Sequence, residues 1–216
     1  MSTVEIIPAV LPKNVDELER GLLHLRGVAP LVQIDLVGSN VLARLEEMPL
    51  WAEFDFEFDI MLESPSHEVR RCIELGASRI VVHADALDAR EAMQMLQETR
   101  QGDFAIAAGI ALAAHDTPEA LLPFEGLFDY VQVMGIDRIG VQSEPPDPHH
   151  HELLLVRALR ARYPSMPIQV DGAAAAHPKE LRDAGASRLI VGSALMSADN
   201  PKEEIKRLYN LSNVRS

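Results

Sequence analysis

Short apolar runs alternate along the chain with stretches whose apolar residues recur at helical spacing. Most of the runs are almost continuously apolar, which is typical of parallel strands that are covered on both faces. They predict eight strands: Val4–Val10, Leu31–Val37, Phe54–Leu62, Arg79–His83, Phe104–Ile110, Tyr130–Gly135, Ile168–Asp171 and Arg188–Gly192. The run Phe54–Leu62 instead alternates phenylalanine with acidic residues, which fits a barrel strand with one side facing inward.

The stretches between the runs predict helices, some with start signals such as Asn14 before Val15. The predicted helices are Val15–Arg26, Val41–Met48 (short), Pro65–Leu75, Ala89–Arg100, Pro118–Leu122, Asp147–Arg162, Pro178–Ala184 and Pro201–Leu208. Eight strand–helix units in 216 residues predict an α/β fold, a (β/α)8 TIM barrel that forms one domain over residues 1–216. A doubly wound open sheet is the alternative, but no G-x-G-x-x-G follows the first strand.

An internal echo favours the closed barrel. The segment Gly76–Val82, Gly-Ala-Ser-Arg-Ile-Val-Val, recurs as Gly185–Val191, Gly-Ala-Ser-Arg-Leu-Ile-Val, about half a chain later. In each copy a glycine ends a helix and a buried strand follows the turn. If these are strands four and eight, the chain consists of two half-barrels, although similar loop chemistry alone could produce the same echo.

Composition narrows the function classes. The chain is 47% hydrophobic and has a net charge of −13, which argues against nucleic acid or an anionic membrane as a partner. A phosphorylated substrate stays compatible, because backbone amides bind phosphate locally. The single cysteine, Cys72, excludes an internal disulfide and suits a reducing compartment, and no signal peptide or membrane-spanning run is found, so we expect a cytoplasmic protein.

Two aspartates close apolar runs at positions where a barrel places its chemistry. Asp35 ends Leu31-Val32-Gln33-Ile34-Asp35, and Asp171 ends Pro167-Ile168-Gln169-Val170-Asp171. Active sites of such barrels lie at the C-terminal ends of the strands, where burial can tune a carboxylate. Capping of the following turn is the structural alternative for each. Small residues at neighbouring strand ends predict an anion site: Gly172, Gly192 and Ser193, with Gly140 and Gln142 in the loop after the sixth strand.

These motifs resemble the ribulose-phosphate 3-epimerase family over nearly the whole chain and in the same order. The matching segments are Pro8-Ala9-Val10-Leu11, Gln33-Ile34-Asp35, Asp59-Ile60-Met61, Val82-His83, Met134, Gly140-Val141-Gln142, Val170-Asp171-Gly172-Ala173 and Gly192-Ser193. The resemblance implies an epimerase that interconverts ribulose 5-phosphate and xylulose 5-phosphate, or a close analogue. It assigns the two proton transfers, on opposite faces of the carbon, to Asp35 and Asp171. It also implies that Met61 and Met134 line the pocket, where barrel packing is the alternative role.

The chain departs from the family pattern at the metal site. The two histidines of that site are replaced by Gln33 and Asp59, so the implied ligand set is Gln33, Asp35, Asp59 and Asp171. All four offer oxygen, which suits Mg²⁺ or Mn²⁺ rather than the zinc or iron that imidazole ligands suit. Without a cation, at least one of the converging carboxylates should be protonated. Ala173 stands in place of a glycine, and we expect it to forbid a positive φ there.

Alternatives stay open. The barrel could be an epimerase or aldolase for another sugar phosphate, or a non-catalytic sugar-phosphate-binding protein that has lost its metal. An Asp-x-Lys pattern, used by related decarboxylases and synthases, is absent after Asp35. The run His149-His150-His151 is interpreted as a solvated turn, and His83 as structural. Apolar helix faces are compatible with a homo-oligomer but specify no symmetry.

Overall fold

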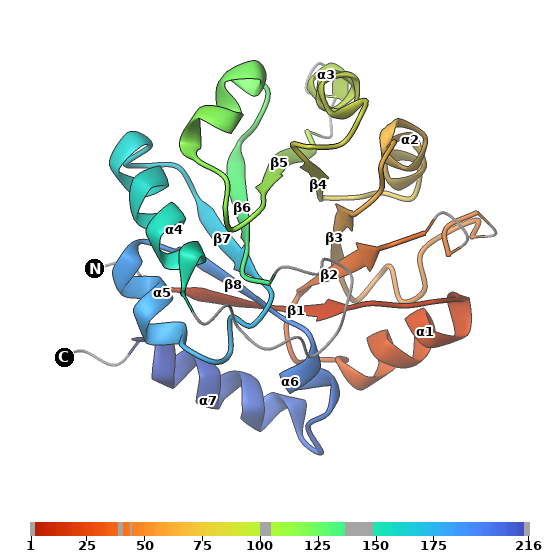
Figure 1. Ribbon diagram of the computed structural model, residues 1–216. Coiled ribbons are helices and arrows are strands. Elements are labelled where there is room, and N and C mark those ends of the chain that lie inside the picture. The colour runs from red at the N-terminus through yellow and green to blue at the C-terminus, as the bar shows by residue number, and fades with distance from the viewer. Residues whose placement is uncertain (1–2, 39–40, 44, 100–104, 137–148, 214–216) are drawn as a thin grey trace.

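The computed structural model describes residues 3–38, 41–43, 45–99, 105–136 and 149–213. Eight parallel strands close into a barrel in the order β1 to β8, and helices surround it (Figure 1). The strands are β1 (Glu5–Val10), β2 (Leu31–Leu36), β3 (Asp55–Ile60), β4 (Arg79–His83), β5 (Ala107–Leu112), β6 (Tyr130–Met134), β7 (Ile168–Asp171) and β8 (Arg188–Val191). The predicted TIM barrel is confirmed, and the repeated segments do lead into β4 and β8.

The helices lie where the apolar spacing predicts them, with three differences. They are α1 (Val15–His24), α2 (Ser66–Glu74), α3 (Ala89–Thr99), η1 (Pro118–Phe124), α4 (His151–Arg162), α5 (Pro178–Ala184), α6 (Ser193–Met196) and α7 (Pro201–Asn213). The segment η1 is a 3₁₀ helix with Pro123 inside it, and proline lacks the N–H that an α-helix requires there. The short helix α6 was not predicted.

The predicted helix Val41–Met48 is wrong over its described residues, which form turns and bends. Val41, Leu42, Leu45 and Met48 are buried in the main core, and their spacing imitates the apolar stripe of a helix. Packing of individual side chains against the barrel explains the pattern without a helix.

Successive side chains of each strand point alternately toward the helices and into the barrel, so the protein has two buried regions. Residues such as Phe56, Phe58 and Ile60 face outward and form the main apolar core between the strands and the helices. The acidic residues of the same strand, Glu57 and Asp59, are fully buried on the other side, inside the barrel. Smaller apolar groups fill part of the barrel interior, namely Ile7, Ala9, Leu31 and Ile190, and Val81, Ala111 and Tyr130.

The two chain ends lie on one side of the molecule, where they are joined (Figure 1). The backbone N–H of Val4 donates to Oδ1 of Asn213 at 2.9 Å, and Nδ2 of Asn213 donates to the Val4 carbonyl. The last helix therefore fastens the start of β1, next to which β8 closes the barrel.

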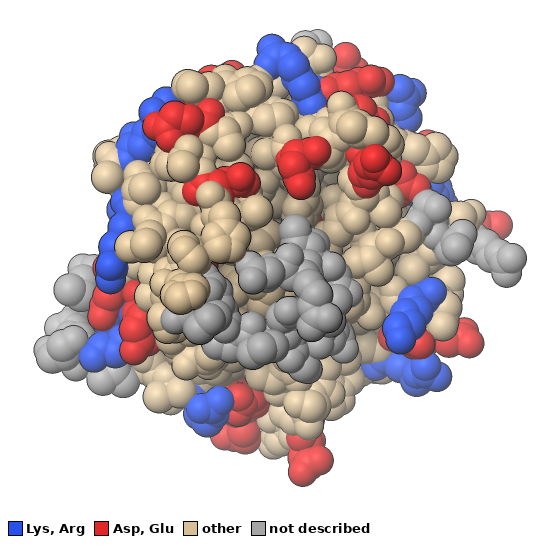
Figure 2. All heavy atoms as spheres, in the orientation of Figure 1, with Lys and Arg blue, Asp and Glu red and all other residues tan. Residues whose placement is uncertain are grey.

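The surface agrees with the acidic composition. On the face drawn in Figure 2, acidic side chains lie in a row across the upper half, while most basic side chains lie near the edges. None of the described helices is both long enough and apolar enough to cross a membrane.

Tyr130 occupies space inside the barrel that a side chain on β5 would otherwise fill. A Cβ added to Gly109 would lie 2.5 Å from Cζ and 2.6 Å from Cε2 of the Tyr130 ring. We therefore expect Gly109→Ala to lower the free energy of unfolding by about 1–3 kcal/mol, because overpacking forces side chains and backbone to shift. Urea denaturation of wild type and variant measures this loss.

Gly38→Ala is the matched control, since a Cβ at Gly38 would meet no atom within 4 Å and its φ is not positive. Equal stability of Gly109→Ala and Gly38→Ala would show that the barrel interior has room beside Tyr130.

Candidate active site

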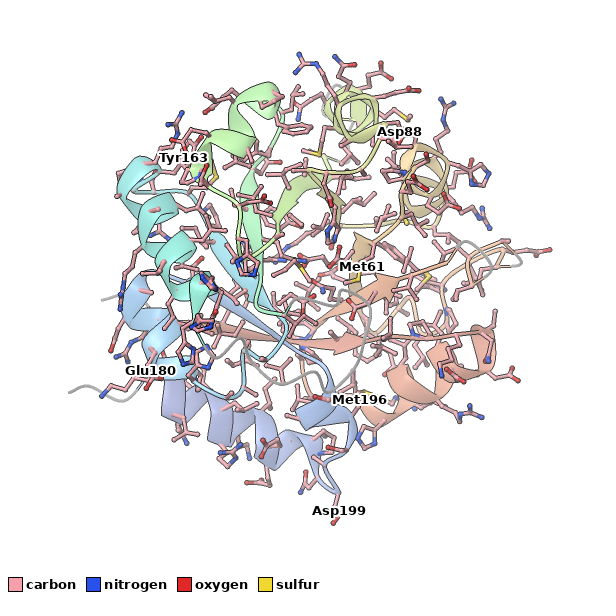
Figure 3. All side chains as sticks on the ribbon, viewed as in Figure 1. Met61, Asp88, Tyr163, Glu180, Met196 and Asp199 are labelled. Atoms are coloured by element: carbon pink, nitrogen blue, oxygen red, sulfur yellow. The ribbon has the colours of Figure 1, made fainter. Side chains whose placement is uncertain are left out.

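The candidate active site is a pocket at the C-terminal ends of β1, β2, β3, β6, β7 and β8. Met61 lies near the middle of the barrel, whereas Asp88, Tyr163, Glu180 and Asp199 lie at the periphery (Figure 3). The pocket lining includes Ala9, Asp35, Met61, Met134, Asp171, Gly172, Ala173, Ile190, Gly192 and Ser193. Seven of the predicted site residues thus line one cavity.

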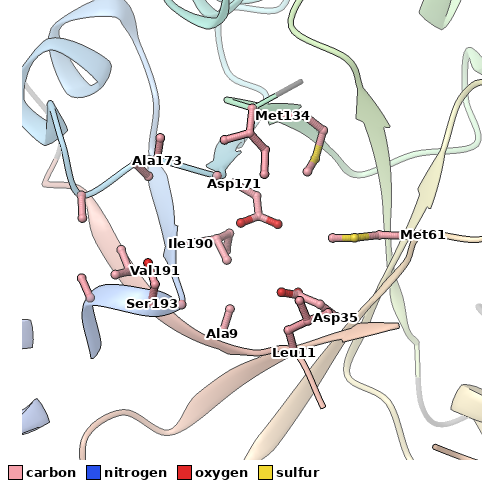
Figure 4. A pocket seen from close by; sticks show the side chains of 16 residues that line it. Ala9, Leu11, Asp35, Met61, Met134, Asp171, Ala173, Ile190, Val191 and Ser193 are labelled. Carbon is pink, nitrogen blue, oxygen red and sulfur yellow. The ribbon is translucent and has the colours of Figure 1, made fainter. Parts of the chain in front are cut away.

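Asp35 and Asp171 reach the pocket from different sides (Figure 4). They stand on β2 and β7, which are separated in the barrel by β1 and β8. Small Ala9 and Ile190 line the wall between them. Two carboxyl groups therefore face the same space, which is what proton transfer on two faces of one small molecule requires.

A third carboxylate lies close to this pair. Asp59, fully buried on β3, sits beside Asp35 in the strand register. One ligand oxygen from each of Asp35, Asp59 and Asp171 lies within 4.8 Å of the other two. Among the described residues, none of the three forms an ion pair with lysine or arginine, so their charges repel without a nearby guanidinium or ammonium group to offset them.

Burial and mutual repulsion raise the pKa of two of these aspartates, Asp35 and Asp171. Burial, followed by the charges of Asp171 and Asp59, raises the pKa of Asp35 well above its ordinary value. Burial and then the charge of Asp59 raise the pKa of Asp171 to about 7, although hydrogen bonds from Gln33 and the Gly172 N–H oppose the rise. A carboxyl group with a pKa near 7 can both accept and return a proton at neutral pH.

Two buried glutamines donate N–H groups to these carboxyl groups, and a third donates to one of the two glutamines. Nε2 of Gln33 donates to Oδ1 of Asp35 at 2.9 Å and to Oδ2 of Asp171 at 3.1 Å. Nε2 of Gln132 donates to Oδ2 of Asp59 at 2.6 Å. Gln169 lies deeper and donates to the amide oxygen of Gln132 at 2.7 Å, so the amides form a chain that points its nitrogens toward the acids.

Gln33 was predicted as a metal ligand, and the structure turns the wrong atom toward the site for that role. Its nitrogen faces Asp35 and Asp171, and its oxygen faces Gln169 at 3.5 Å. A cation accepts electron pairs from oxygen and not from an amide N–H. In this arrangement Gln33 hydrogen-bonds to both carboxyl groups, and its role as a metal ligand stays a prediction.

The direction of the amide chain is set at the bottom of the barrel. Nε2 of Gln169 donates to Oε1 of the fully buried Glu57 at 2.7 Å, and Tyr130 donates its hydroxyl to Oε2 at 3.2 Å. Burial raises the pKa of Glu57, while the Gln169 hydrogen bond and the charge of Arg79 act against the rise. Arg79 lies 3.6 Å from Oε2 of Glu57, so an anion at this position has partners on several sides.

His83 lies at the end of β4 and contacts the acid cluster. Its Nε2 is 3.0 Å from Oδ1 of Asp59. Burial alone would lower the pKa of His83, but the charge of Asp59 and this hydrogen bond together raise it. Both oxygens of Asp59 therefore have a hydrogen-bond partner, from His83 and from Gln132, which fixes the orientation of the carboxylate.

The ends of β6 and β7 approach closely beside Asp171. The Gly135 N–H donates to the Asp171 carbonyl at 2.6 Å, and a Cβ on Gly135 would collide with the Gly172 carbonyl oxygen. Glycine at 135 is thus required by space, and it holds the backbone of the predicted catalytic residue.

The backbone conformation of Ala173 differs from the one that we expected for an alanine. Its φ is +53°, in the left-handed region that we expected alanine to forbid. Such a conformation costs an L-residue roughly 1–2 kcal/mol, which the surrounding structure must offset. The loop after β7 therefore keeps the backbone form that suits glycine although it carries alanine.

The remaining predicted residues divide into three groups. Met134 and the half-buried Met61 line the pocket as predicted, and Gln132 lies 3.4 Å from the Met134 sulfur. Gly192 and Ser193 stand at the start of α6, where the first N–H groups have no partner within the helix. Gly140 and Gln142 lie outside the described residues.

Gln132, Gln169 and Glu57 were missed as site residues. Their strands look almost wholly apolar or merely alternating, so each polar residue passes for an isolated exception. One signal was available: Gln33-Ile34-Asp35 and Gln169-Val170-Asp171 repeat a glutamine two residues before each aspartate. Residues two apart on a strand share a face, so both pairs must point into the barrel.

Comparison with known proteins agrees with the arrangement. The model of the ribulose-phosphate 3 epimerase family matches residues 13–196. The chain belongs to this family. It is 29% identical over 223 residues to a ribulose-phosphate 3-epimerase of Schizosaccharomyces pombe, an alignment that covers 97% of this chain and 94% of the relative.

Solved structures with low sequence identity share the fold. A 3-hexulose-6-phosphate synthase superposes with a TM-score of 0.70 at 15% identity, covering 96% of this chain and 99% of that chain. Orotidine 5'-phosphate decarboxylase of Pyrococcus horikoshii OT3 gives 0.60 at 18% identity, covering 97% of this chain and 100% of that chain. These likenesses describe the barrel and not its chemistry.

The histidine run His149-His150-His151 was interpreted from the sequence as a solvated turn. In the structure His150 precedes α4 with a left-handed backbone, so the three consecutive histidines do not share one helix. His150 and His177 both contact the buried Glu152, at 3.3 and 2.7 Å. The turn is therefore part of a side-chain cluster.

The raised pKa of Asp171 predicts how the stability of the metal-free protein depends on pH. A carboxyl group whose folded pKa exceeds its unfolded value stabilises the fold at low pH, and this contribution is lost as pH rises through the folded value, about 7. We expect the unfolding temperature in chelator to fall between pH 5 and pH 8, and to fall less in Asp171→Asn.

Thermal unfolding at several pH values, with the Asp55→Asn variant as control, measures the difference. Asp55 is exposed at the opposite end of β3 and takes no part in the cluster. Identical slopes for wild type and Asp171→Asn would contradict the proposed protonation of Asp171.

Proposed function

We propose that this protein is an epimerase that inverts the carbon next to the ketone of a phosphorylated ketopentose. Ribulose 5-phosphate and xylulose 5-phosphate, or close analogues, are the proposed substrates. The observation that carries the proposal is the pair Asp35 and Asp171, which face one pocket from β2 and β7. Membership of the ribulose-phosphate 3-epimerase family supports this reaction over the alternatives.

In the proposed mechanism one aspartate removes the proton from one face of the substrate carbon, and the other returns a proton to the opposite face. The intermediate is an enediolate, whose negative charge must be stabilised between the two transfers. Gln33 donates to both carboxyl groups, so it holds them in a fixed relation to each other while their protonation states exchange. In the metal-free protein, burial and the charge of Asp59 raise the pKa of Asp171 to about 7.

The residues present fit a divalent cation. Three carboxylates whose oxygens lie within 4.8 Å of one another repel, and a cation among them would relieve that repulsion. The proposed ligands are Asp35, Asp59 and Asp171, an all-oxygen set that suits Mg²⁺ or Mn²⁺ rather than zinc or iron. When bound, such an ion acts as a Lewis acid that stabilises negative charge on the substrate oxygens.

The phosphate is proposed to bind at the far side of the pocket, near Gly172, Gly192 and Ser193. Backbone N–H groups at the start of α6 and after β7 offer donors for an anion, and Met61 and Met134 line the sugar end. The small phosphorylated sugar is the proposed partner, and cytoplasmic localisation stays a prediction.

An aldolase or a non-catalytic binding barrel is a weaker candidate, because neither explains two acids on opposite sides of one pocket.

Single-acid variants separate a two-base reaction from other mechanisms. We expect Asp35→Asn and Asp171→Asn each to slow epimerisation by about 10²–10⁴-fold, the usual contribution of a positioned acid or base. Each variant should keep solvent-hydrogen exchange in one epimer only, and the two variants should keep opposite epimers. The remaining acid can still remove and return the proton on its own face.

Deuterium incorporation at C3, followed by NMR for ribulose 5-phosphate and xylulose 5-phosphate, gives this readout, with Asp55→Asn as the control of unchanged activity. Loss of exchange from the same epimer in both variants would refute the two-base mechanism. Binding of both sugars by wild type without exchange, with any of Mg²⁺, Mn²⁺, Zn²⁺ or Fe²⁺, would favour the non-catalytic alternative.

Removal of one carboxylate tests the cation. We expect Asp59→Asn to weaken Mn²⁺ binding at least tenfold, since it removes a charged ligand but keeps the size of the side chain. Equilibrium dialysis with elemental analysis, again beside Asp55→Asn, measures the bound metal. Absence of bound Mn²⁺ or Mg²⁺ from wild-type protein would remove the cation from the proposal.

A further inference from the structure

A second cluster of ligand-type side chains lies outside the pocket, at the N-terminal ends of α4 and α5. Five of the eight histidines in the sequence gather there: His115, His149, His150, His151 and His177. The buried Glu152 is the anion to which His150 and His177 turn. Three segments far apart in the sequence contribute to this corner.

Three of these residues bring potential ligand atoms close together. Nδ1 of His150 lies 3.3 Å and Nε2 of His177 lies 2.7 Å from Oε1 of Glu152. All three ligand atoms lie within 4.8 Å of one another. Ligands about 2.0–2.1 Å from a tetrahedral zinc ion are roughly 3.3 Å apart, so small side-chain movements bring the set to that spacing.

A separate observation points to a missing partner. The other carboxylate oxygen of Glu152, Oε2, is buried and has no hydrogen-bond partner among the residues that the structure describes, and only 1% of the side chain is exposed. A buried carboxylate oxygen without a partner is costly, and an ion held by both oxygens would satisfy it. The ring of His150 is 48% exposed, which leaves an open side for a water ligand and a path for entry.

We propose that His150, Glu152 and His177 form a second metal site, which takes a zinc-class transition-metal ion. Two imidazoles and one carboxylate suit Zn²⁺, Ni²⁺ or Cu²⁺, in contrast to the all-oxygen set of the three aspartates. The site joins the start of α4, which follows β6, to His177 at the end of the loop after β7. That loop supplies Gly172, Ala173, Ala174 and Ala175 to the pocket lining, so the bound ion holds one wall of the pocket.

The test uses tag-free, full-length protein and zinc chloride as the probe. With ¹⁵N-labelled histidine, zinc is expected to move the ring-nitrogen signals of His150 and His177, and calorimetry is expected to detect one zinc ion bound at this corner. His177→Gln should raise the zinc Kd at least tenfold and should abolish the rise in unfolding temperature that zinc causes in wild type. His150→Gln, at a half-exposed position, repeats the measurement if His177→Gln does not fold.

His67→Gln is the matched control. Nδ1 of His67 also lies 3.3 Å from a glutamate oxygen, that of Glu68, but the structure offers no third ligand in the described region, so zinc binding should be unchanged. The proposal is overturned if zinc leaves the signals of His150 and His177 in place. It is equally overturned if zinc binding survives His150→Gln and His177→Gln but is lost in Asp59→Asn or in the double variant His149→Gln/His151→Gln.

Discussion

Three carboxyl groups share one largely buried site, and their mutual repulsion is the constraint on which the rest of the barrel depends. Asp35, Asp59 and Asp171 bring their oxygens within 4.8 Å of one another. Burial of unpaired like charges would cost several kcal/mol, so the protein must protonate them, give them donors or place a cation among them. The raised pKa values of Asp35 and Asp171 favour protonation, and the glutamine amides supply hydrogen-bond donors.

This constraint accounts for the polar part of the barrel interior. Stability comes chiefly from the apolar layer between strands and helices, where Phe56, Phe58 and Ile60 are buried. The interior is therefore available for a hydrogen-bonded column that runs from Glu57 through Gln169 to Gln132 and Asp59. A polar network of this kind fixes the orientation of its amide groups. Glu57 accepts from Gln169, and this hydrogen bond sets which end of each following amide is the donor.

Local sequence patterns are enough to predict the fold, but they predict only part of the candidate site. Apolar runs, one of them alternating with acidic residues, predict all eight strands, and the repeated Gly-Ala-Ser-Arg segments lead into β4 and β8, half a barrel apart. Asp35 and Asp171 could be predicted because they end strands, where the topology of a parallel barrel brings side chains together. The glutamines that donate hydrogen bonds to these acids could not be predicted. The sequence does not indicate which atom of a glutamine in a buried strand faces which neighbour.

Other differences have equally local causes. The buried residues between Val41 and Met48 imitate a helical stripe, and Ala173 adopts a positive φ that its side chain disfavours. His177 joins His150 only through the loop after β7, a contact between segments that spacing along the chain cannot reveal. Each of these depends on tertiary contacts rather than on propensity.

The central claim is that the three aspartates form one cation-binding, proton-transferring centre in the mouth of the barrel. A crystal soaked in Mn²⁺, with anomalous scattering recorded at the manganese edge, tests it most directly. The account predicts one anomalous peak bound by oxygens of Asp35, Asp59 and Asp171, with Gln33 hydrogen-bonded behind them. A fully soaked crystal without a peak at these three residues, or with the carboxyl groups turned apart, would contradict it.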